Sequence, residues 1–399
     1  MKIDDKTSHN SPSIRFPEFT GEWEKCKLGT LATKVGSGST PKGGDAVYTS
    51  IGHYFVRSQN VGMGFLMLDN IAHINDDIHQ KHKATEIYEN DVLLNITGAS
   101  IGRTAVATKE LEGGNVNQHV CIIRTNSKVN PKFLCDYIQT QRIQNHIKSL
   151  QTGGSREGLN FEQIRSFPIS LPSINEQNKL TCLLDKINER IATQVRLIED
   201  LKKLRCAIVE KMFKQSKANG RLGDFIEQVS VRNKNGLYSN VLSVSNKQGF
   251  VKQSEQFEDR TVASEDTSNY KIVKRNNFAY NPARINVGSI ARLTKFDVGI
   301  VSPMYVCFRT KASIIPEYME AFFTSQQFFY EMMKRLEGSV RLCLSYEGLC
   351  NIPVYIPDMN KQIAMGQNIS LILSKIGLEI EYLGRLHQQK QYLLRKMFI

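Results

Sequence analysis

The chain repeats one plan twice, and this repetition limits its fold more than any other feature. When the sequence is shifted by 185 positions, the second half aligns with the first at distinctive residues. The aligned sets are Pro131-Lys132-Phe133 with Pro316-Glu317-Tyr318, then Pro168, Pro172, Gln177 and residues 211–213 with Pro353, Pro357, Gln362 and residues 396–398. A tandem duplication predicts approximate internal symmetry. Such a molecule suits a two-part target, and duplex DNA read at two half-sites is the obvious candidate.

Composition narrows the class of protein. A chain of 399 residues can form two or more domains. No apolar run approaches the ~20 residues of a membrane span, and the polar residues 1–13 contain no signal-peptide core. The eight cysteines form no C-x-x-C pair. We therefore expect a cytoplasmic protein with free thiols and no membrane contact. The net charge of +13 favours a polyanionic partner.

Each half shows the same succession of predicted elements. Stretches rich in β-branched residues and glycine, 28–125 and 222–310, contain apolar runs typical of strands at 120–123 and 305–308. Proline-led amphipathic helices are predicted over 131–150 and 316–336. Glycine-containing loops at 153–156 and 338–341 follow, and short strands at 167–171 and 352–356 close each unit.

A long helix of about 40 residues, ~60 Å in length, follows each unit. Ser173 and Glu176 form an S-x-x-E capping box at the first start, and Asp358 is a candidate N-cap at the second. Apolar residues recur every three to four positions in both helices, which is typical of a coiled-coil seam. The seam positions are Leu184, Ile187, Ile191, Ile198, Leu201, Ile208 and Met212, and Ile369, Ile372, Ile376, Leu383, Leu386, Leu393 and Met397.

Polar interruptions of the two seams favour antiparallel pairing. In one antiparallel register Arg205 faces Glu379 and Gln194 faces Lys390, whereas parallel pairing would place Arg205 against Lys390. We predict an α/β (α+β) architecture with pseudo-twofold symmetry. It has two β-rich domains, 1–172 and 218–357, separated by an antiparallel two-helix coiled coil made of 173–217 and 358–399. The alternative is that each apolar stripe packs on its own domain.

Several polar segments are candidates for contact with DNA. The loop 36–44 combines glycine, hydroxyl groups and Lys42 without the spacing of a phosphate-binding P-loop. Arg, Gln and Asn side chains can read guanine and adenine edges, and the equivalent arginines at 156 and 341 could grip phosphates. The candidate residues are Ser37, Ser39, Thr40, Lys42, Arg57, Gln59, Asn60, Ser100, Arg103, Asn117, Gln118, Arg156, Arg284, Asn286, Ser289, Ser302 and Arg341.

The sequence contains no recognisable catalytic constellation. The segment 281–284 lacks the second proline and the aromatic residue of an [ND]-P-P-[YF] methyltransferase motif, and no ATPase phosphate loop is present. His79 and His82 have no acidic or cysteine neighbours at zinc spacing, so we expect them at the surface. We predict no catalytic, metal-binding or cofactor-binding residues.

With these features the chain resembles the specificity subunit of type I restriction-modification enzymes. Residues Pro172 to Gln177 resemble the family's P-x-x-x-E-Q helix start. The segment 15–19, Trp23, the segment 27–29, the loop 36–41 and the Lys-Met-Phe ends resemble its Gram-positive branch. The resemblance implies two target recognition domains that read a bipartite, asymmetric site in double-stranded DNA. It also implies helices that hold two modification subunits.

The remaining implications concern partners. Modification subunits would bind S-adenosylmethionine, and restriction subunits would use ATP and Mg²⁺, so this chain would be non-catalytic. The alternatives are a two-headed protein–protein scaffold that reads no DNA sequence, and a nuclease or modifying enzyme with an unrecognised site.

Overall fold

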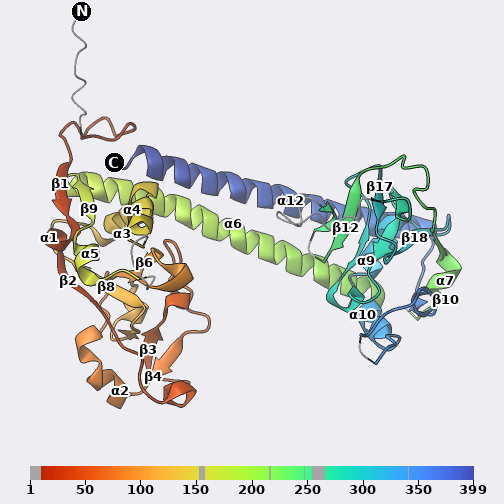
Figure 1. Cartoon of the computed structure of the whole chain (residues 1–399), viewed down its shortest axis with the longest axis horizontal. Helices are drawn as coiled ribbons and strands as arrows, with labels where there is room; N and C mark the ends of the chain where they lie inside the picture. The colour runs from red at the N-terminus through yellow and green to blue at the C-terminus, as the bar shows by residue number, and fades with distance from the viewer. Residues whose placement is uncertain (1–9, 152–157, 215–216, 247, 254–265, 340) are drawn as a thin grey trace, which may run out of the picture. The chain divides into compact units, whose positions relative to one another are not determined.

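The computed structural model describes residues 10–151, 158–214, 217–246, 248–253, 266–339 and 341–399, except for the side chain at position 45. The chain divides into two compact units. Unit 1 comprises Met1–Thr193 and Leu383–Ile399, and unit 2 comprises Gln194–Tyr382. Figure 1 shows that both contain strands, short helices and parts of the two long helices. Among the described residues, no helix combines the length and apolar character needed to cross a bilayer.

The described residues of unit 1 form three small sheets. The antiparallel sheet has the order β2-β8-β5-β6 and is made of Ala32–Ser37, Val120–Thr125, Val92–Asn95 and Thr104–Val106. A second sheet, β4-β3-β7, contains Ala72–Ile74, His53–Val56 and Asn115–Val116, with β3 and β7 parallel. A third pairs β1 (Glu24–Lys27) with β9 (Pro168–Leu171). The predicted strands at 120–123 and 167–171 are therefore confirmed, with one-residue to two-residue differences at their ends.

Short helices connect the sheets of unit 1. They are α1 (Leu28–Leu31), α2 (Asp76–Lys81), α3 (Pro131–Gln139), α4 (Gln141–Gln151) and α5 (Phe161–Arg165), with 3-10 turns η1 (Gly44–Val47), η2 (Ser58–Asn60), η3 (Lys83–Thr85), η4 (Gly98–Ser100) and η5 (Lys109–Leu111).

Unit 2 contains sheets of the same kind. The sheet β11-β18-β15-β16 comprises Ile226–Gln228, Val306–Thr310, Phe278–Tyr280 and Ile290–Arg292. The sheet β13-β12-β17-β14 comprises Gly249–Lys252, Val241–Ser245, Val298–Val301 and Lys271–Lys274, with β12 and β17 parallel. The pair β10-β19 joins Gly220–Arg221 to Pro353–Val354. The helices are α7 (Leu222–Phe225), α9 (Pro316–Phe322), α10 (Gln326–Met333) and α11 (Tyr346–Cys350), with η6 at Ile285–Val287.

The two proline-led helices are each broken, which corrects the prediction of continuous helices over 131–150 and 316–336. Thr140 has an extended backbone and separates α3 from α4. Ser325 separates α9 from α10 and accepts a hydrogen bond from the Phe328 N–H as the N-cap of α10. A hydroxyl residue at this point offers the backbone an alternative to continued helix. Thr140 and Ser325 are 185 positions apart, so both units are broken at the same place.

The long helices α6 (Ile174–Lys214) and α12 (Met359–Lys396) begin with the same hydrogen bonds. Buried Gln177 donates to the carbonyls of Lys128 and Pro172 at 3.1 and 2.9 Å and accepts from the Asn130 N–H at 2.8 Å. Gln362 makes the equivalent bonds to Ser313, Pro357 and Ile315. Each glutamine therefore joins the start of a long helix to the loop that precedes α3 or α9.

The start of α6 is capped differently from the prediction. The Glu176 N–H donates to Ser173 Oγ at 3.4 Å, which is one half of a capping box. The Glu176 carboxylate, however, accepts two hydrogen bonds of 2.7 Å from Arg15 and one of 3.3 Å from Trp23. At the start of α12 the predicted cap is confirmed, since Asp358 accepts from the Lys361 N–H at 3.0 Å.

Opposite ends of the long helices complete the core of each unit. In unit 1, Leu180 and Leu184 of α6 share a core with Leu394 and Met397 of α12, and the C-terminus lies beside the start of α6 (Figure 1). In unit 2, Val209 near the end of α6 shares a core with Ile369 near the start of α12. Every predicted seam position is buried or half-buried.

Matching aromatic clusters close the two cores. The Phe398 ring lies 5.4 Å from Phe133 and 6.1 Å from Tyr137 in unit 1. The Phe213 ring lies 5.3 Å from Tyr318 and 5.2 Å from Phe322 in unit 2. These are the Lys-Met-Phe ends noted in the sequence. Each phenylalanine fills the core of its unit.

The predicted pairs between polar seam residues are wrong. Gln194 donates to the Glu379 carbonyl at 3.1 Å and also to its carboxylate. Lys390 is buried in unit 1 and donates to Gln139 Oε1 at 3.1 Å. Arg205 lines a cavity of about 280 Å³ with Glu320. The apolar stripe repeats at every turn, so it fits several registers equally well.

Candidate nucleic-acid interface

The loop after β2 is held against the end of β7. A Cβ atom at Gly38 would lie 1.7 Å from the Val116 carbonyl oxygen, so only glycine allows the chain to pass there. The Gly38 N–H donates to the Asn117 carbonyl at 3.2 Å. This contact brings the predicted loop that contains Ser39, Thr40 and Lys42 beside the turn that contains Gln118.

A chain of side-chain hydrogen bonds joins three loops. Thr40 Oγ1 donates to Gln118 Oε1, and Gln118 Nε2 lies 3.0 Å from His119 Nε2. His119 Nδ1 in turn lies 2.6 Å from Thr97 Oγ1. Ser39 Oγ lies 2.9 Å from His82 Nε2. Segments that are distant in sequence therefore form one polar surface in unit 1.

The turn that contains Ser100 and Arg103 belongs to the same surface. It closes the end of β5, where the Asn95 N–H donates to the Arg103 carbonyl at 2.8 Å and the Gly102 N–H donates to the Asn95 carbonyl at 2.9 Å. Ser100 is half-buried and the Arg103 side chain is exposed. Lys42 is also exposed, so two cations are available to phosphates.

The segment that contains Arg57 and Gln59 adjoins this surface through the backbone. The Asn117 N–H donates to the Val56 carbonyl at 3.0 Å. The Arg57 guanidinium lies 5.4 Å from the centre of the Tyr48 ring, and its buried Nε finds no hydrogen-bond acceptor among the described residues. Gln59 is exposed.

Three predicted contact residues have side chains that serve the fold. Asn60 is 3% exposed, accepts from the Arg57 N–H and donates to the Met67 carbonyl. Asn117 is 6% exposed and accepts from the His119 N–H at 3.0 Å. In unit 2, Ser289 is 3% exposed and donates to the Val244 carbonyl at 3.3 Å. This burial argues against direct base contacts by these side chains.

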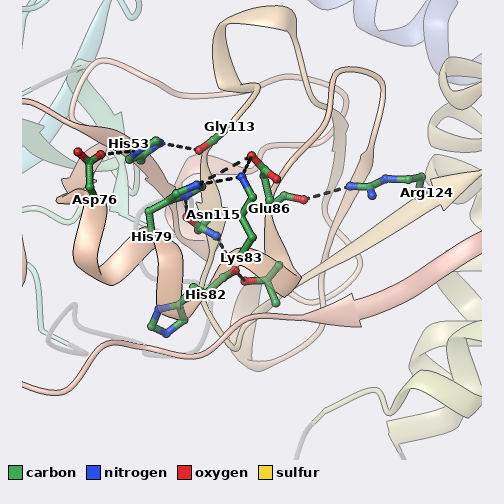
Figure 2. A network of polar contacts seen from close by, with 10 residues as sticks. His53, Asp76, His79, His82, Lys83, Glu86, Gly113, Asn115 and Arg124 are labelled. Atoms are coloured by element: carbon green, nitrogen blue, oxygen red, sulfur yellow. Dashed lines mark hydrogen bonds and ion pairs between the residues drawn. The ribbon is translucent and has the colours of Figure 1, made fainter.

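A network of polar contacts includes the backbone carbonyl of His82, and Figure 2 shows its members. His53 and His79 stack with ring centres 3.8 Å apart. His79 Nδ1 lies 2.8 Å from Asn115 Oδ1, and Asn115 Nδ2 donates to the His82 carbonyl at 2.9 Å (Figure 2). His79 is therefore buried, contrary to the expectation of a surface residue, because α2 packs on β3 and β7.

Two of the loops that carry predicted residues in unit 2 are joined by a backbone hydrogen bond. The Leu344 N–H donates to the Pro282 carbonyl at 3.1 Å, which brings the segment after Arg341 beside the segment before Arg284. Both arginines are exposed, and Asn286 is half-buried. Ser302 is half-buried in a turn where its carbonyl accepts from the Tyr305 N–H.

Two further residues need separate mention. Ser37 is half-buried at the end of β2 and is paired with Cys121 of β8. Arg156 lies outside the described residues. Sequence reasoning missed His82 and His119 as members of the surface. Their contacts reach Ser39, 43 positions away, and Thr97, 22 positions away, and no local pattern encodes such contacts.

Comparison with known proteins identifies the class of domain. Residues 20–203 match the family described as type I restriction modification DNA specificity domain. The matched part of the chain contains the polar surface of unit 1.

Two curated relatives are specificity subunits. The chain is 24% identical over 135 residues to the type I restriction enzyme EcoBI specificity subunit of Escherichia coli, a match that covers 33% of this chain and 28% of the relative. It is 20% identical over 208 residues to the putative type I restriction enzyme MjaX specificity subunit of Methanocaldococcus jannaschii, covering 51% and 48%. The chain thus spans less than half the length of these relatives.

Two solved structures show the same fold over almost the whole chain. The type I restriction-modification S subunit from M. genitalium has a TM-score of 0.59 at 17% identity, with 98% of this chain and 99% of that chain covered. A chain from a structure on complex assembly and conformational transition of the type I R-M system has a TM-score of 0.57 at 14% identity, with 94% and 97% covered.

Proposed function

We propose that this chain is the DNA specificity subunit of a type I restriction-modification complex and directs methylation and restriction by partner subunits. The observation that carries the proposal is the convergence of four segments, 37–42, 57–60, 97–103 and 117–119, on one polar surface inside the segment that matches the DNA specificity domain. Exposed Lys42 and Arg103 supply charge for phosphates, and exposed amides supply groups for base edges.

The proposal includes two recognition domains with a helical spacer. Residues 1–172 and 218–357 form the domains, and 173–217 and 358–399 form the spacer helices. The start of α6 shares a core with the end of α12 in unit 1, and the reverse holds in unit 2, which supports antiparallel helices and pseudo-twofold symmetry. Different loops on equivalent sheets would read different half-sites, so the target is bipartite and asymmetric.

The chain itself is proposed to be non-catalytic and to act in the cytoplasm, in a system of the Gram-positive branch. Two modification subunits would supply S-adenosylmethionine chemistry, and restriction subunits would supply ATP- and Mg²⁺-dependent chemistry. Apolar side chains on the outer faces of the long helices support subunit binding. Leu197 and Leu204 of α6 are 40% and 49% exposed, and Leu371 and Leu378 of α12 are 68% and 60% exposed.

Selection from a library of random DNA duplexes tests the proposal. The chain, assembled with its modification partner, should enrich duplexes with two conserved parts separated by a fixed spacer, and its affinity should fall steeply as salt rises. Equal binding to all duplexes would refute sequence reading. The chain alone should neither cleave DNA nor transfer methyl groups.

A further inference from the structure

Gln118 lies in a hydrogen-bonded turn of the polar surface of unit 1. The Val120 N–H donates to the Asn117 carbonyl at 3.4 Å, and the Ile96 N–H donates to the His119 carbonyl at 3.0 Å. The residues on either side are buried or half-buried, whereas the Gln118 side chain is exposed. The turn therefore presents one amide to the outside on a fixed backbone.

Two neighbours orient the Gln118 amide. Thr40 Oγ1 donates to Oε1, and Nε2 lies within hydrogen-bond distance, 3.0 Å, of His119 Nε2. His119 is itself held by Thr97 Oγ1 at 2.6 Å from Nδ1. When Gln118 Nε2 donates, His119 Nε2 is the acceptor and His119 Nδ1–H donates to Thr97. The side chain is thus fixed before any ligand arrives.

The hydrogen-bonding groups of the Gln118 amide that Thr40 and His119 leave free indicate which ligand it can bind. A glutamine amide has two N–H donors and two acceptor lone pairs. The contacts with Thr40 and His119 use one of each, and no other described residue engages the amide. One donor and one acceptor are left at an exposed position. Adenine offers a matching pair in the major groove, N7 as an acceptor and N6–H as a donor.

We infer that Gln118 is a specificity-determining residue that reads an adenine in the half-site bound by the first domain, with Thr40 and His119 as positioning residues. This inference rests on the proposed DNA-reading function and adds the base that Gln118 reads and the two residues that orient it. A side chain that is already oriented in the free protein favours binding to a base, because it loses less rotamer freedom on binding.

The equivalent turn of unit 2 offers no such amide. The Tyr305 N–H donates to the Ser302 carbonyl, as the Val120 N–H does to the Asn117 carbonyl 185 positions earlier. The exposed residues of this turn are Pro303 and Met304, which contain no side-chain amide. The contribution of Gln118 is therefore confined to one of the two half-sites.

The test uses the full chain assembled with its modification partner and a library of random duplexes. Gln118→Leu should relax the preference for adenine at one position of one half-site, with a loss of discrimination of roughly 5- to 150-fold. His119→Leu should relax the same position, and His119→Gln, whose amide oxygen can accept from Gln118, should restore part of the preference. Gln80→Leu, which changes an exposed glutamine on α2, is the matched control.

Each outcome decides the inference. Relaxation confined to one adenine, with thermal melting of the variants unchanged, supports it. The inference is overturned by an unchanged consensus, by a uniform loss of affinity over all sequences, or by relaxation at a different base. None of these results would contradict DNA reading by the wild-type chain. Failure of the wild-type complex to enrich any sequence would refute the proposed function, and this inference with it.

Discussion

The buried carboxyl group of Asp136 should make the stability of unit 1 depend on pH. Asp136 lies on α3 and is 6% exposed. Burial raises its pKa from 3.8 to about 7, although the charge of Lys390 acts in the opposite direction. Its carboxylate accepts a 3.3 Å hydrogen bond from Gln139, which also accepts from Lys390. Between about pH 4 and pH 7, Asp136 therefore keeps its proton in the folded chain and loses it in the unfolded chain.

The size and sign of this effect follow from the two pKa values. Because the folded-state pKa is raised, the contribution is fully present below pH 4 and is lost as pH rises through about 7. A pKa difference of one unit corresponds to about 1.4 kcal/mol. Relative to pH values below 4, the raised pKa of Asp136 therefore lowers the free energy of unfolding by about 4 kcal/mol at pH 8 and by about 1.5 kcal/mol at pH 5, where only the unfolded chain is ionised at this residue. Asp136→Asn removes this cost.

Urea unfolding of wild type and Asp136→Asn at pH 5 and pH 8 measures the difference. The variant should be the more stable, and its advantage should grow by about 2.5 kcal/mol between the two pH values. Asp69→Asn, at an exposed loop position, should follow the wild type. A variant that is less stable than wild type at pH 8 would show that the electrostatic attraction of Lys390 outweighs the burial of the carboxylate.

Three further predictions test separate parts of the structure. Glu176→Gln should lower the free energy of unfolding by about 3 kcal/mol because it leaves the largely buried Arg15 cation without a negative partner. Lys179→Met, which breaks an exposed pair with Glu18 and a contact with the Phe16 ring, should cost less than about 1 kcal/mol. Equal urea midpoints for the two variants would contradict this prediction. Gln177→Ala and Gln362→Ala should each lower the free energy of unfolding by about 1–3 kcal/mol in the same assay, because each removes the side-chain partner of two carbonyls and one N–H. A large decrease for only one of the two variants would show that the two glutamines are not equivalent. Arg103→Ala should weaken DNA binding and reduce the slope of log affinity against log salt by about 1, measured by titration over a salt series; an unchanged slope would exclude a phosphate contact.

Features encoded by local patterns could be predicted from the sequence. The strand at 120–123, the cap at Asp358 and the inward-facing apolar positions of the long helices depend on neighbours within one or two turns. The burial of His79 depends on contacts with Asn115 and His53, which lie far away in the chain. The partner of Glu176 is Arg15, 161 positions earlier, so a helix-capping rule could not find it.

The candidate surface was predictable in outline. The segments at 37–42, 57–60, 97–103 and 117–118 were recognisable by composition, because glycine, hydroxyl, amide and basic residues gather in them. Sequence could not separate the exposed Gln118 from the buried Asn117, its direct neighbour. Which side of a turn faces the core is decided by tertiary packing.

Mapping methylated sites after lengthening both spacer helices tests the central claim most directly. One heptad inserted after Thr193 in α6 and one after Tyr382 in α12 would extend an antiparallel spacer by ~10 Å. This length is about three base pairs at 3.4 Å per step. In cells that contain the modification partner, we predict unchanged half-site sequences separated by a spacer about three base pairs longer. An unchanged spacer, or altered half-sites, would contradict a two-headed reader held apart by its own helices.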